Sequence, residues 1–154
     1  MRPLPADIVE RLQSLGGLCD IIGFRVTKVT YEETVAMLTI GDQHKQPHGI
    51  VHGGVYAAMV ESACSIGAAM QVFYEERNIV GLDNHTTFLR AVKEGTLTVT
   101  ATPIKCGRRT HLWQASVADD QGRIAAHGQV NLMVLASDGP SLAMTNLNGS
   151  GPAA

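Results

Sequence analysis

The chain has 154 residues and a formal net charge of −2; 45% of its residues are hydrophobic and 17% are charged. This composition provides enough apolar side chains for one folded core, leaves little room for a second domain and excludes a globally disordered chain. The slightly negative net charge argues against general electrostatic binding of nucleic acid, which requires a concentrated positive face.

The N-terminal segment MRPLPADIVE has no continuous apolar run, so we expect no signal peptide and a cytoplasmic location. The three cysteines are odd in number and scattered without CxxC spacing, which predicts neither a disulfide framework nor a zinc site. The most apolar stretch, residues 53–70, is interrupted by Glu61 and is shorter than the run of about 20 apolar residues that spans a bilayer. We therefore expect no membrane segment.

The first predicted element is a short amphipathic helix over residues 4–15, because apolar side chains recur there at helical spacing until two glycines end the pattern. Two strands are predicted over residues 24–30 and 34–40, which are rich in β-branched and apolar residues and are separated by a turn. Residues 41–51 are polar, contain Pro and Gly, and are predicted to form a loop.

One long helix is predicted in the middle of the chain, over residues 53–70. Its sequence, GGVYAAMVESACSIGAAM, is apolar nearly all round and consists mainly of small residues. Such a helix must be buried on most sides, with other elements packed close to its backbone.

Strand patterns dominate the rest of the chain. Four further strands are predicted over residues 79–89, 96–102, 112–118 and 124–134. The order of elements predicts an α+β fold in which an antiparallel sheet wraps around one central helix. We expect a single domain over residues 1–136, followed by a disordered tail over residues 137–154, which are rich in Gly, Pro, Ser and Asn.

Candidate chemistry is concentrated around the start of the central helix. Gly53 and Gly54 open this helix, where backbone N–H groups lack intrahelical partners and lie at the positive end of the helix dipole. These groups form a natural oxyanion site. Glu61 is the only formally charged residue of the helix, and a carboxylate in an apolar helix is costly unless it is paired or used. Ser65 lies one turn further on the same face.

The spacing of Gly53 and Glu61 predicts an assembly. The two residues are eight positions apart, so their backbones are separated by about 12 Å along the helix axis. One helix cannot easily offer both groups to a single carbonyl, because an oxyanion donor and a base must both lie about 3 Å from reacting atoms. We therefore expect a homodimer with two shared sites, each using Gly53 from one chain and Glu61 from its partner.

The segment QPHGIVHGGVYAAMVESACS, residues 46–65, resembles the helix signature of hotdog-fold acyl-CoA thioesterases in the PaaI-like and 4-hydroxybenzoyl-CoA thioesterase group. Residues 81–83 (GLD) and 88–95 (FLRAVKEG) are similar to the next strand and turn of that group. Gly107-Arg108 matches its Gly-Arg step between later strands. The resemblance covers roughly residues 24–135, which is most of the chain.

This resemblance implies a role for each of five residues. Glu61 takes the position of the catalytic carboxylate, acting as nucleophile or general base. Gly53 supplies the oxyanion N–H, and Gln46 orients the thioester carbonyl or the water. His52 supports the loop or the carbonyl site, and Ser65 positions water.

The implied activity is hydrolysis of an acyl-CoA thioester to free CoA and a carboxylic acid, without a cofactor or metal, by a dimer or a dimer of dimers. Guanidinium groups bind phosphates well, so basic residues are candidates for CoA contacts, although a solvated strand end explains the same residues. The expected substrate-binding residues are Gly54, Arg90, Gly107, Arg108 and Arg109. Some relatives carry a further histidine where this chain has Phe88 or Leu89.

Structural explanations compete with these roles. Glu61 could be a structural acid paired with an arginine or histidine across the dimer, and the two glycines could simply permit close packing. A metal site at the evenly spaced His44, His48 and His52 is disfavoured, because Pro and Gly between them interrupt any helix. Ser65 as a serine-hydrolase nucleophile is disfavoured by the absence of GxSxG.

Two other functions compete with thioester hydrolysis on the same fold. A non-catalytic acyl-CoA-binding or sensing protein would bind tightly without releasing thiol. An acyl-CoA dehydratase would need an Asp-His pair at the helix entry, and Glu61 has no such partner in the sequence.

Overall fold

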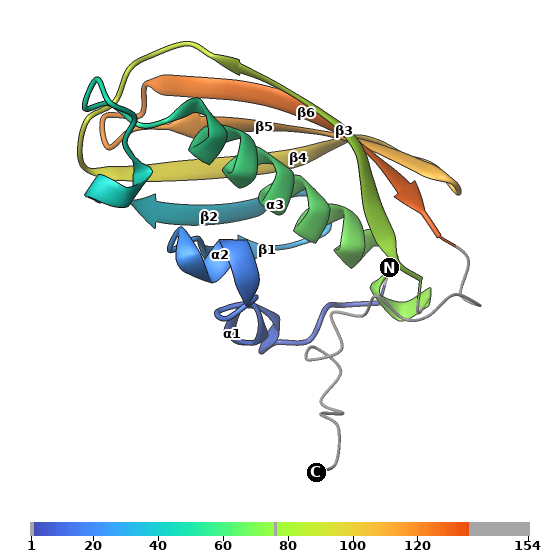
Figure 1. The fold of residues 1–154 in the computed structure, drawn as a ribbon. Helices are drawn as coiled ribbons and strands as arrows, with labels where there is room; N and C mark the ends of the chain where they lie inside the picture. The colour runs from blue at the N-terminus through green and yellow to red at the C-terminus, as the bar shows by residue number, and fades with distance from the viewer. Residues whose placement is uncertain (1, 76, 136–154) are drawn as a thin grey trace.

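The computed structural model describes residues 2–75 and 77–135 of the chain. The tail predicted over residues 137–154 lies outside the described residues. The described residues confirm the predicted α+β architecture, in which one antiparallel sheet wraps around one long helix (Figure 1).

The sheet has six strands in the order β1-β2-β4-β5-β6-β3, and every neighbouring pair is antiparallel. The strands are β1 Arg25–Val29, β2 Thr34–Thr39, β3 Ile79–Phe88, β4 Thr96–Cys106, β5 Thr110–Ala118 and β6 Ile124–Val134. The long helix α3, Gly53–Gln71, lies across the sheet and contacts the strands β2 to β6 (Figure 1).

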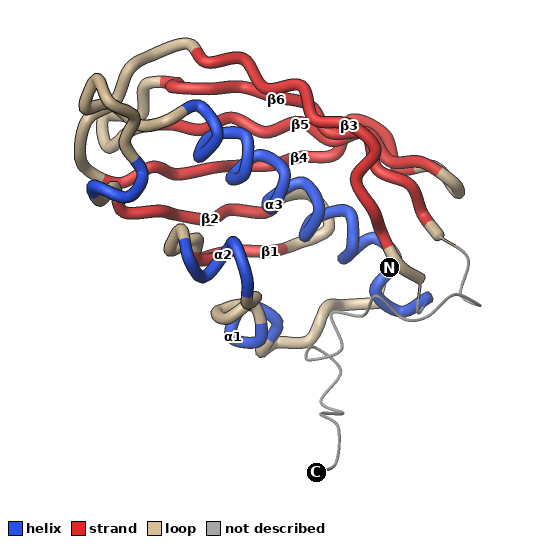
Figure 2. The backbone as a smooth tube through the Cα atoms, viewed as in Figure 1, coloured by secondary structure: helices blue, strands red, loops and turns tan. Residues whose placement is uncertain are grey.

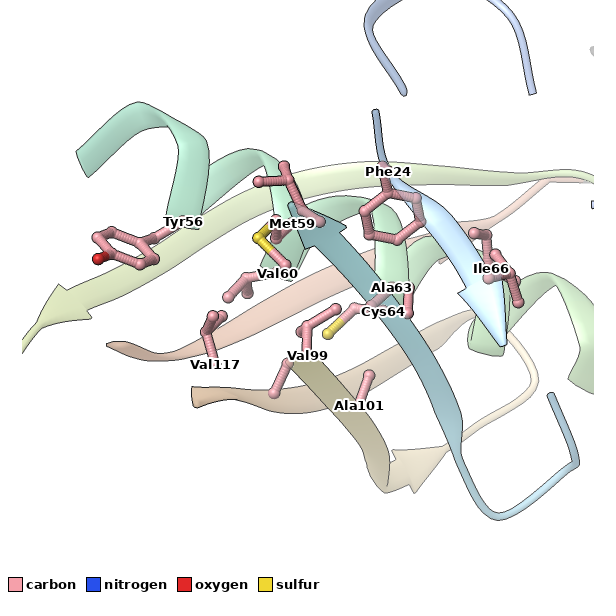
Figure 3. Close-up of a cluster of buried hydrophobic side chains, with 14 of the residues drawn as sticks. Phe24, Tyr56, Met59, Val60, Ala63, Cys64, Ile66, Val99, Ala101 and Val117 are labelled. Carbon is pink, nitrogen blue, oxygen red and sulfur yellow. The ribbon is translucent and has the colours of Figure 1, made fainter. Parts of the chain in front are cut away.

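Small residues on α3 allow the sheet to approach the helix backbone closely. A Cβ atom placed on Gly67 would lie 2.5 Å from Cζ3 of Trp113, the largest fully buried side chain. Val99 and Ala101 alternate with outward-facing threonines along β4 and are fully buried against the helix (Figure 3). The small-residue composition of α3 therefore has a packing cause.

The N-terminal helix is shorter than predicted. Instead of one helix over residues 4–15, the structure has α1 at Ile8–Arg11 and a second helix, α2, at Gly17–Ile21. A proline disfavours a helical conformation at the residue before it, so Pro5 disfavours a helix that starts at Leu4. Gly16 and Gly17 both have positive φ; Gly16 is the N-cap residue of α2 and Gly17 is its first residue, so the glycine pair forms the turn that leads into α2.

The two edges of the sheet differ. Edge strand β1 has five residues, carries Arg25 and Lys28, and is interrupted by a register shift. Strand β3 lies at the opposite edge, beside β6 (Figure 2). It has ten residues, and its Leu82 and Phe88 side chains are about half exposed. Charges and irregularities protect an edge from pairing with another chain. Because β3 has one register shift and one charged residue, Asp83, over ten residues, it is less protected than the shorter and more highly charged β1.

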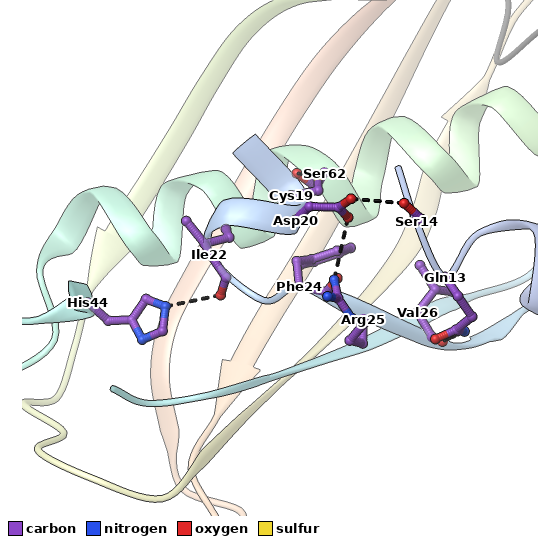
Figure 4. Close-up of polar contacts among 10 residues, drawn as sticks. All are labelled: Gln13, Ser14, Cys19, Asp20, Ile22, Phe24, Arg25, Val26, His44 and Ser62. Atoms are coloured by element: carbon purple, nitrogen blue, oxygen red, sulfur yellow. Dashed lines mark hydrogen bonds and ion pairs between the residues drawn. The ribbon is translucent and has the colours of Figure 1, made fainter. Parts of the chain in front are cut away.

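A buried histidine fixes the loop that leads into α3. His44 ends the 3-10 turn η1, Asp42–His44, and its Nδ1 atom accepts a hydrogen bond from the Gly41 N–H at 2.8 Å. Its Nε2 atom lies 3.0 Å from the carbonyl oxygen of Ile22, at the end of α2 (Figure 4). Both ring nitrogens are therefore used inside the protein. A second 3-10 turn, η2 Phe73–Glu75, follows α3.

Candidate active site

The backbone N–H groups of the first two residues of α3, Gly53 and Gly54, differ in their hydrogen bonding. His52 is the N-cap residue, and its Nδ1 atom accepts the Gly54 N–H at 2.9 Å. Gly53 is the first helical residue, and its N–H has no intrahelical acceptor by position. The geometry therefore favours Gly53 over Gly54 as an oxyanion donor and gives His52 a role in supporting the helix start.

A cavity of about 260 Å³ lies beside this helix start. It brings together three of the residues singled out in the sequence, namely Gln46, Gly53 and Arg90. The remaining lining residues are Ile50, Val51, Tyr56, Phe88, Leu89 and Ala91. A mostly apolar wall with a few polar groups at its margin is typical of a small-molecule site.

The ring of Phe88 lies directly against the helix start. A Cβ atom placed on Gly53 would lie 2.6 Å from Cε2 and 2.8 Å from Cζ of Phe88. The ring also packs against Tyr56, with 6.1 Å between the ring centroids. Gly53 is thus required for close approach of this aromatic wall, in addition to any role of its N–H group.

Glu61 is half-buried and is held by neutral groups. Its Oε2 atom accepts a hydrogen bond from Nδ2 of Asn84 at 3.0 Å, and its Oε1 atom accepts a long one from the Ser65 hydroxyl at 3.4 Å. A Cβ atom on Gly81 would lie 2.5 Å from Oε1, so the carboxylate also lies against β3. Within residues 2–75 and 77–135, no ion pair involves Glu61.

The thiol next to this acid is inert. Cys64 is fully buried, and burial raises the pKa of its thiol far above the usual range, with the negative charge of Glu61 adding to the effect. A thiol that stays protonated is a poor nucleophile. Cys64 is therefore a packing residue of the hydrophobic core.

The structure does not bring all of the predicted residues together within one chain. Glu61 does not line the cavity and lies two turns from Gly53. Arg108 and Arg109 lie in the turn between β4 and β5, where the Arg109 carbonyl accepts the Val134 N–H. That turn lies with Gly107 at the Ile79 end of β3, whereas Arg90 follows the Phe88 end, about 30 Å away for a ten-residue strand.

Asn84 is a site residue that the sequence analysis missed. Its side chain spans from β3 to α3, donating both to Glu61 and to the Ala57 carbonyl at 3.1 Å. The sequence did contain a hint of this contact. The Glu61 carboxylate in an apolar helix needs a hydrogen-bond donor, and the Asn84 amide lies in the middle of a predicted strand.

The described residues contain neither a cluster suited to a metal ion nor a helix suited to a membrane. No group of three or more His, Cys, Asp and Glu side chains there is arranged to hold a metal ion. None of the helices in this part of the chain has the length and apolar character needed to cross a bilayer.

The arrangement has counterparts among known proteins. The family model described as the thioesterase superfamily matches residues 48–126, which contain the helix start and Glu61. The Mycobacterium tuberculosis protein named "Putative esterase Rv1847" is 37% identical over 116 residues, covering 74% of this chain and 83% of that protein. A Listeria monocytogenes protein named 1,4-dihydroxy-2-naphthoyl-CoA hydrolase is 30% identical over 118 residues, covering 77% of this chain and 95% of that protein.

Solved structures extend the likeness to three dimensions. The structure of a thioesterase from Haemophilus influenzae superimposes with a TM-score of 0.83 at 26% identity, covering 90% of this chain and 98% of that chain. The structure of Rv1847 has a TM-score of 0.74, with 76% and 94% of the two chains covered. These matches confirm the predicted hotdog fold.

Proposed function

The chain belongs to the thioesterase superfamily and is a thioester hydrolase, and we propose that its substrates are acyl-CoA thioesters, which it cleaves to free CoA and a carboxylic acid. The observation that carries this proposal is the half-buried Glu61 carboxylate, held by neutral donors beside an edge strand. The name of the Listeria relative, a CoA thioester hydrolase, supports the choice of CoA.

In the proposed reaction, the thioester carbonyl oxygen accepts the Gly53 N–H, with Gln46 at the margin of the same cavity orienting it. A preorganised donor of this kind stabilises the developing negative charge by about 3 kcal/mol. As a general base, Glu61 removes a proton from the water that attacks the carbonyl carbon and returns it to the departing thiolate, so that CoA leaves as the thiol. As a nucleophile, Glu61 displaces CoA to form a mixed anhydride, which water then hydrolyses to the carboxylic acid and free Glu61 while the thiolate takes up a proton from that water. Ser65 is placed to steady the carboxylate or the water.

We place this reaction at a site shared by two copies of the chain. Gly53 lies beside Phe88, whereas Glu61 lies beside Gly81 and Asn84, so the two groups occupy different levels along β3. If two β3 strands pair antiparallel about a two-fold axis near His85, Phe88 of one copy comes level with residue 82 of the other. Gly53 then approaches Glu61 of the partner subunit.

The long and sparsely charged edge of β3 supports this pairing. Its ten residues contain one formal charge, Asp83, whose carboxylate oxygens accept hydrogen bonds from Asn131 at 2.9 and 3.0 Å. The same two-fold axis brings Arg90 of one copy toward the sheet end that carries Arg108 and Arg109 of the partner subunit. We propose that these three guanidinium groups contact the phosphates of CoA.

The test is release of free thiol from short, long and aromatic acyl-CoAs by the wild-type protein and by Glu61→Gln. The wild type should release thiol, and the variant should be at least about 100-fold slower, because a carboxamide can act neither as base nor as nucleophile. Unchanged circular dichroism and elution volume would show that the variant folds and assembles normally. Tight acyl-CoA binding by the wild type without thiol release would instead favour a sensing protein.

A further inference from the structure

Thr86 carries a hydroxyl group on the side of β3 that faces α3. The side chains of Asn84 and Phe88, two positions before and two positions after it, both contact α3, and side chains alternate between the two faces of a strand. Thr86 is half-buried, and its partner in the ladder on β6 is Gly128. The Thr86 side chain therefore belongs to the row that faces the proposed site.

A glycine on β6 leaves room for this hydroxyl group. A Cβ atom on Gly128 would lie 2.6 Å from Oγ1 of Thr86 and 3.0 Å from Cγ1 of Val60 in α3. The neighbours of Gly128 on the same face of β6, Ala126 and Val130, carry side chains and are fully buried. Gly128 therefore opens a gap between β6 and α3, and the Thr86 hydroxyl lies in that gap.

The Thr86 hydroxyl holds one end of the Asn84 amide group. It donates a hydrogen bond to Oδ1 of Asn84 at 2.6 Å, and it must be the donor because an amide oxygen carries no hydrogen atom. At the other end of the amide, Nδ2 donates to Oε2 of Glu61 at 3.0 Å and to the Ala57 carbonyl oxygen at 3.1 Å. The amide is thus fixed from β3 at its oxygen and from α3 at its nitrogen.

We propose that Thr86 is a positioning residue that acts on the Glu61 carboxylate through Asn84. The inference rests on the proposed function, in which this carboxylate attacks the thioester or activates water. A carboxylate that must reach a reacting atom works more slowly when its position is less well defined. In a chain of hydrogen bonds each bond also polarises the next, so donation by Thr86 strengthens donation by Asn84 to Glu61.

The test compares two adjacent threonines of β3. Thr86→Val removes the hydroxyl group and keeps the shape of the side chain, and the matched control Thr87→Val does the same on the opposite face of the strand. Thr86→Val should lower kcat for acyl-CoA hydrolysis at least about threefold and leave KM within about twofold, because only the carboxylate loses a positioning contact. Thr87→Val and the conservative Thr86→Ser, which keeps a hydroxyl donor, should both stay within about 1.5-fold of the wild-type kcat.

A double-mutant cycle shows whether Thr86 acts through Asn84. In the Asn84→Ala background the hydroxyl has no amide to hold, so adding Thr86→Val should lower kcat by less than about 1.5-fold. A further loss of about threefold in this background would overturn the inference, because Thr86 would then act independently of Asn84. A kcat loss below about threefold for Thr86→Val alone would overturn it as well.

A measurement without turnover separates this inference from the proposed function. The side-chain amide protons of Asn84 are identified in an NMR spectrum by their absence from Asn84→Ala, and their exchange with solvent is followed. Exchange should be at least about threefold faster in Thr86→Val and unchanged in Thr87→Val, because the amide is then held at one end only. If the wild type releases no thiol, the proposed function fails, and the exchange rates still decide whether Thr86 holds Asn84. Equal exchange in the wild type and Thr86→Val would overturn the inference.

Discussion

Asn84 holds the carboxylate of Glu61 in place, since its side-chain amide donates the shorter of the two hydrogen bonds to that group. We expect Asn84→Ala to lower kcat about tenfold with KM within twofold, because the carboxylate loses a positioning contact that is remote from CoA. Asn84→Asp should lose more than Asn84→Ala, because it removes the donor and places a like charge beside Glu61. Steady-state kinetics on both variants measure this order, and equal losses would contradict it.

Gly53 and Phe88 offer a second test at the residue scale. A side chain at Gly53 meets the Phe88 ring, so Gly53→Ala should cost about 1–3 kcal/mol of stability or displace the aromatic wall. The N–H donor is retained in this variant, and thioesterase activity should therefore fall through lost geometry. The double variant Gly53→Ala/Phe88→Leu should recover part of the stability and part of the thioesterase activity that Gly53→Ala loses. A double-mutant cycle of melting temperature and kcat/KM measures this coupling, and strictly additive effects would show that the two residues act independently.

Close packing between α3 and the sheet governs stability at the scale of the elements. A methyl group added at Gly67 would meet Trp113 at 2.5 Å and the Thr34 hydroxyl at 3.0 Å. We expect Gly67→Ala to lower the melting temperature by about 3 to 10 °C, the consequence of about 1–3 kcal/mol of overpacking. The control is Ser62→Ala on the same helix, which adds no volume and should change the melting temperature by less than about 2 °C. Equal melting temperatures for Gly67→Ala and wild type would show that the neighbouring side chains move to accommodate the added methyl group.

The elements differ in how far the sequence could predict them. The central helix was predictable from its long run of small apolar residues, which is typical of a helix buried on most sides. The alternation of Leu97, Val99 and Ala101 in β4 was predictable because burial on one face of a strand leaves a pattern of period two. The helix over residues 4–15 was wrong in extent, because a four-residue turn leaves the same short apolar pattern. Contacts between elements, such as Asn84 with Glu61, depend on strand register, which one sequence does not encode in its periodicity.

At the scale of the whole molecule, β3 is the surface on which the proposed dimer depends. A charge at His85, near the proposed two-fold axis, would face its own copy in the partner. We therefore expect His85→Glu to weaken dimerisation and to lower kcat/KM at least tenfold at low protein concentration. Sedimentation velocity and thiol release over a dilution series measure both effects. The control Thr27→Glu places the same charge on β1, the protected edge, and should leave assembly and activity close to wild type.

Subunit mixing tests the sharing of the site directly. One parent carries Glu61→Gln, and the other carries Gly53→Val, which fills the space beside Phe88. If each site joins Gly53 of one chain to Glu61 of its partner, a heterodimer has one site with both native groups and one site with neither. Random exchange makes about half of the dimers mixed, so activity should rise from near zero to about 25% of wild type. A site contained within one chain would leave every site in the mixture defective, and activity would stay at the level of the parents.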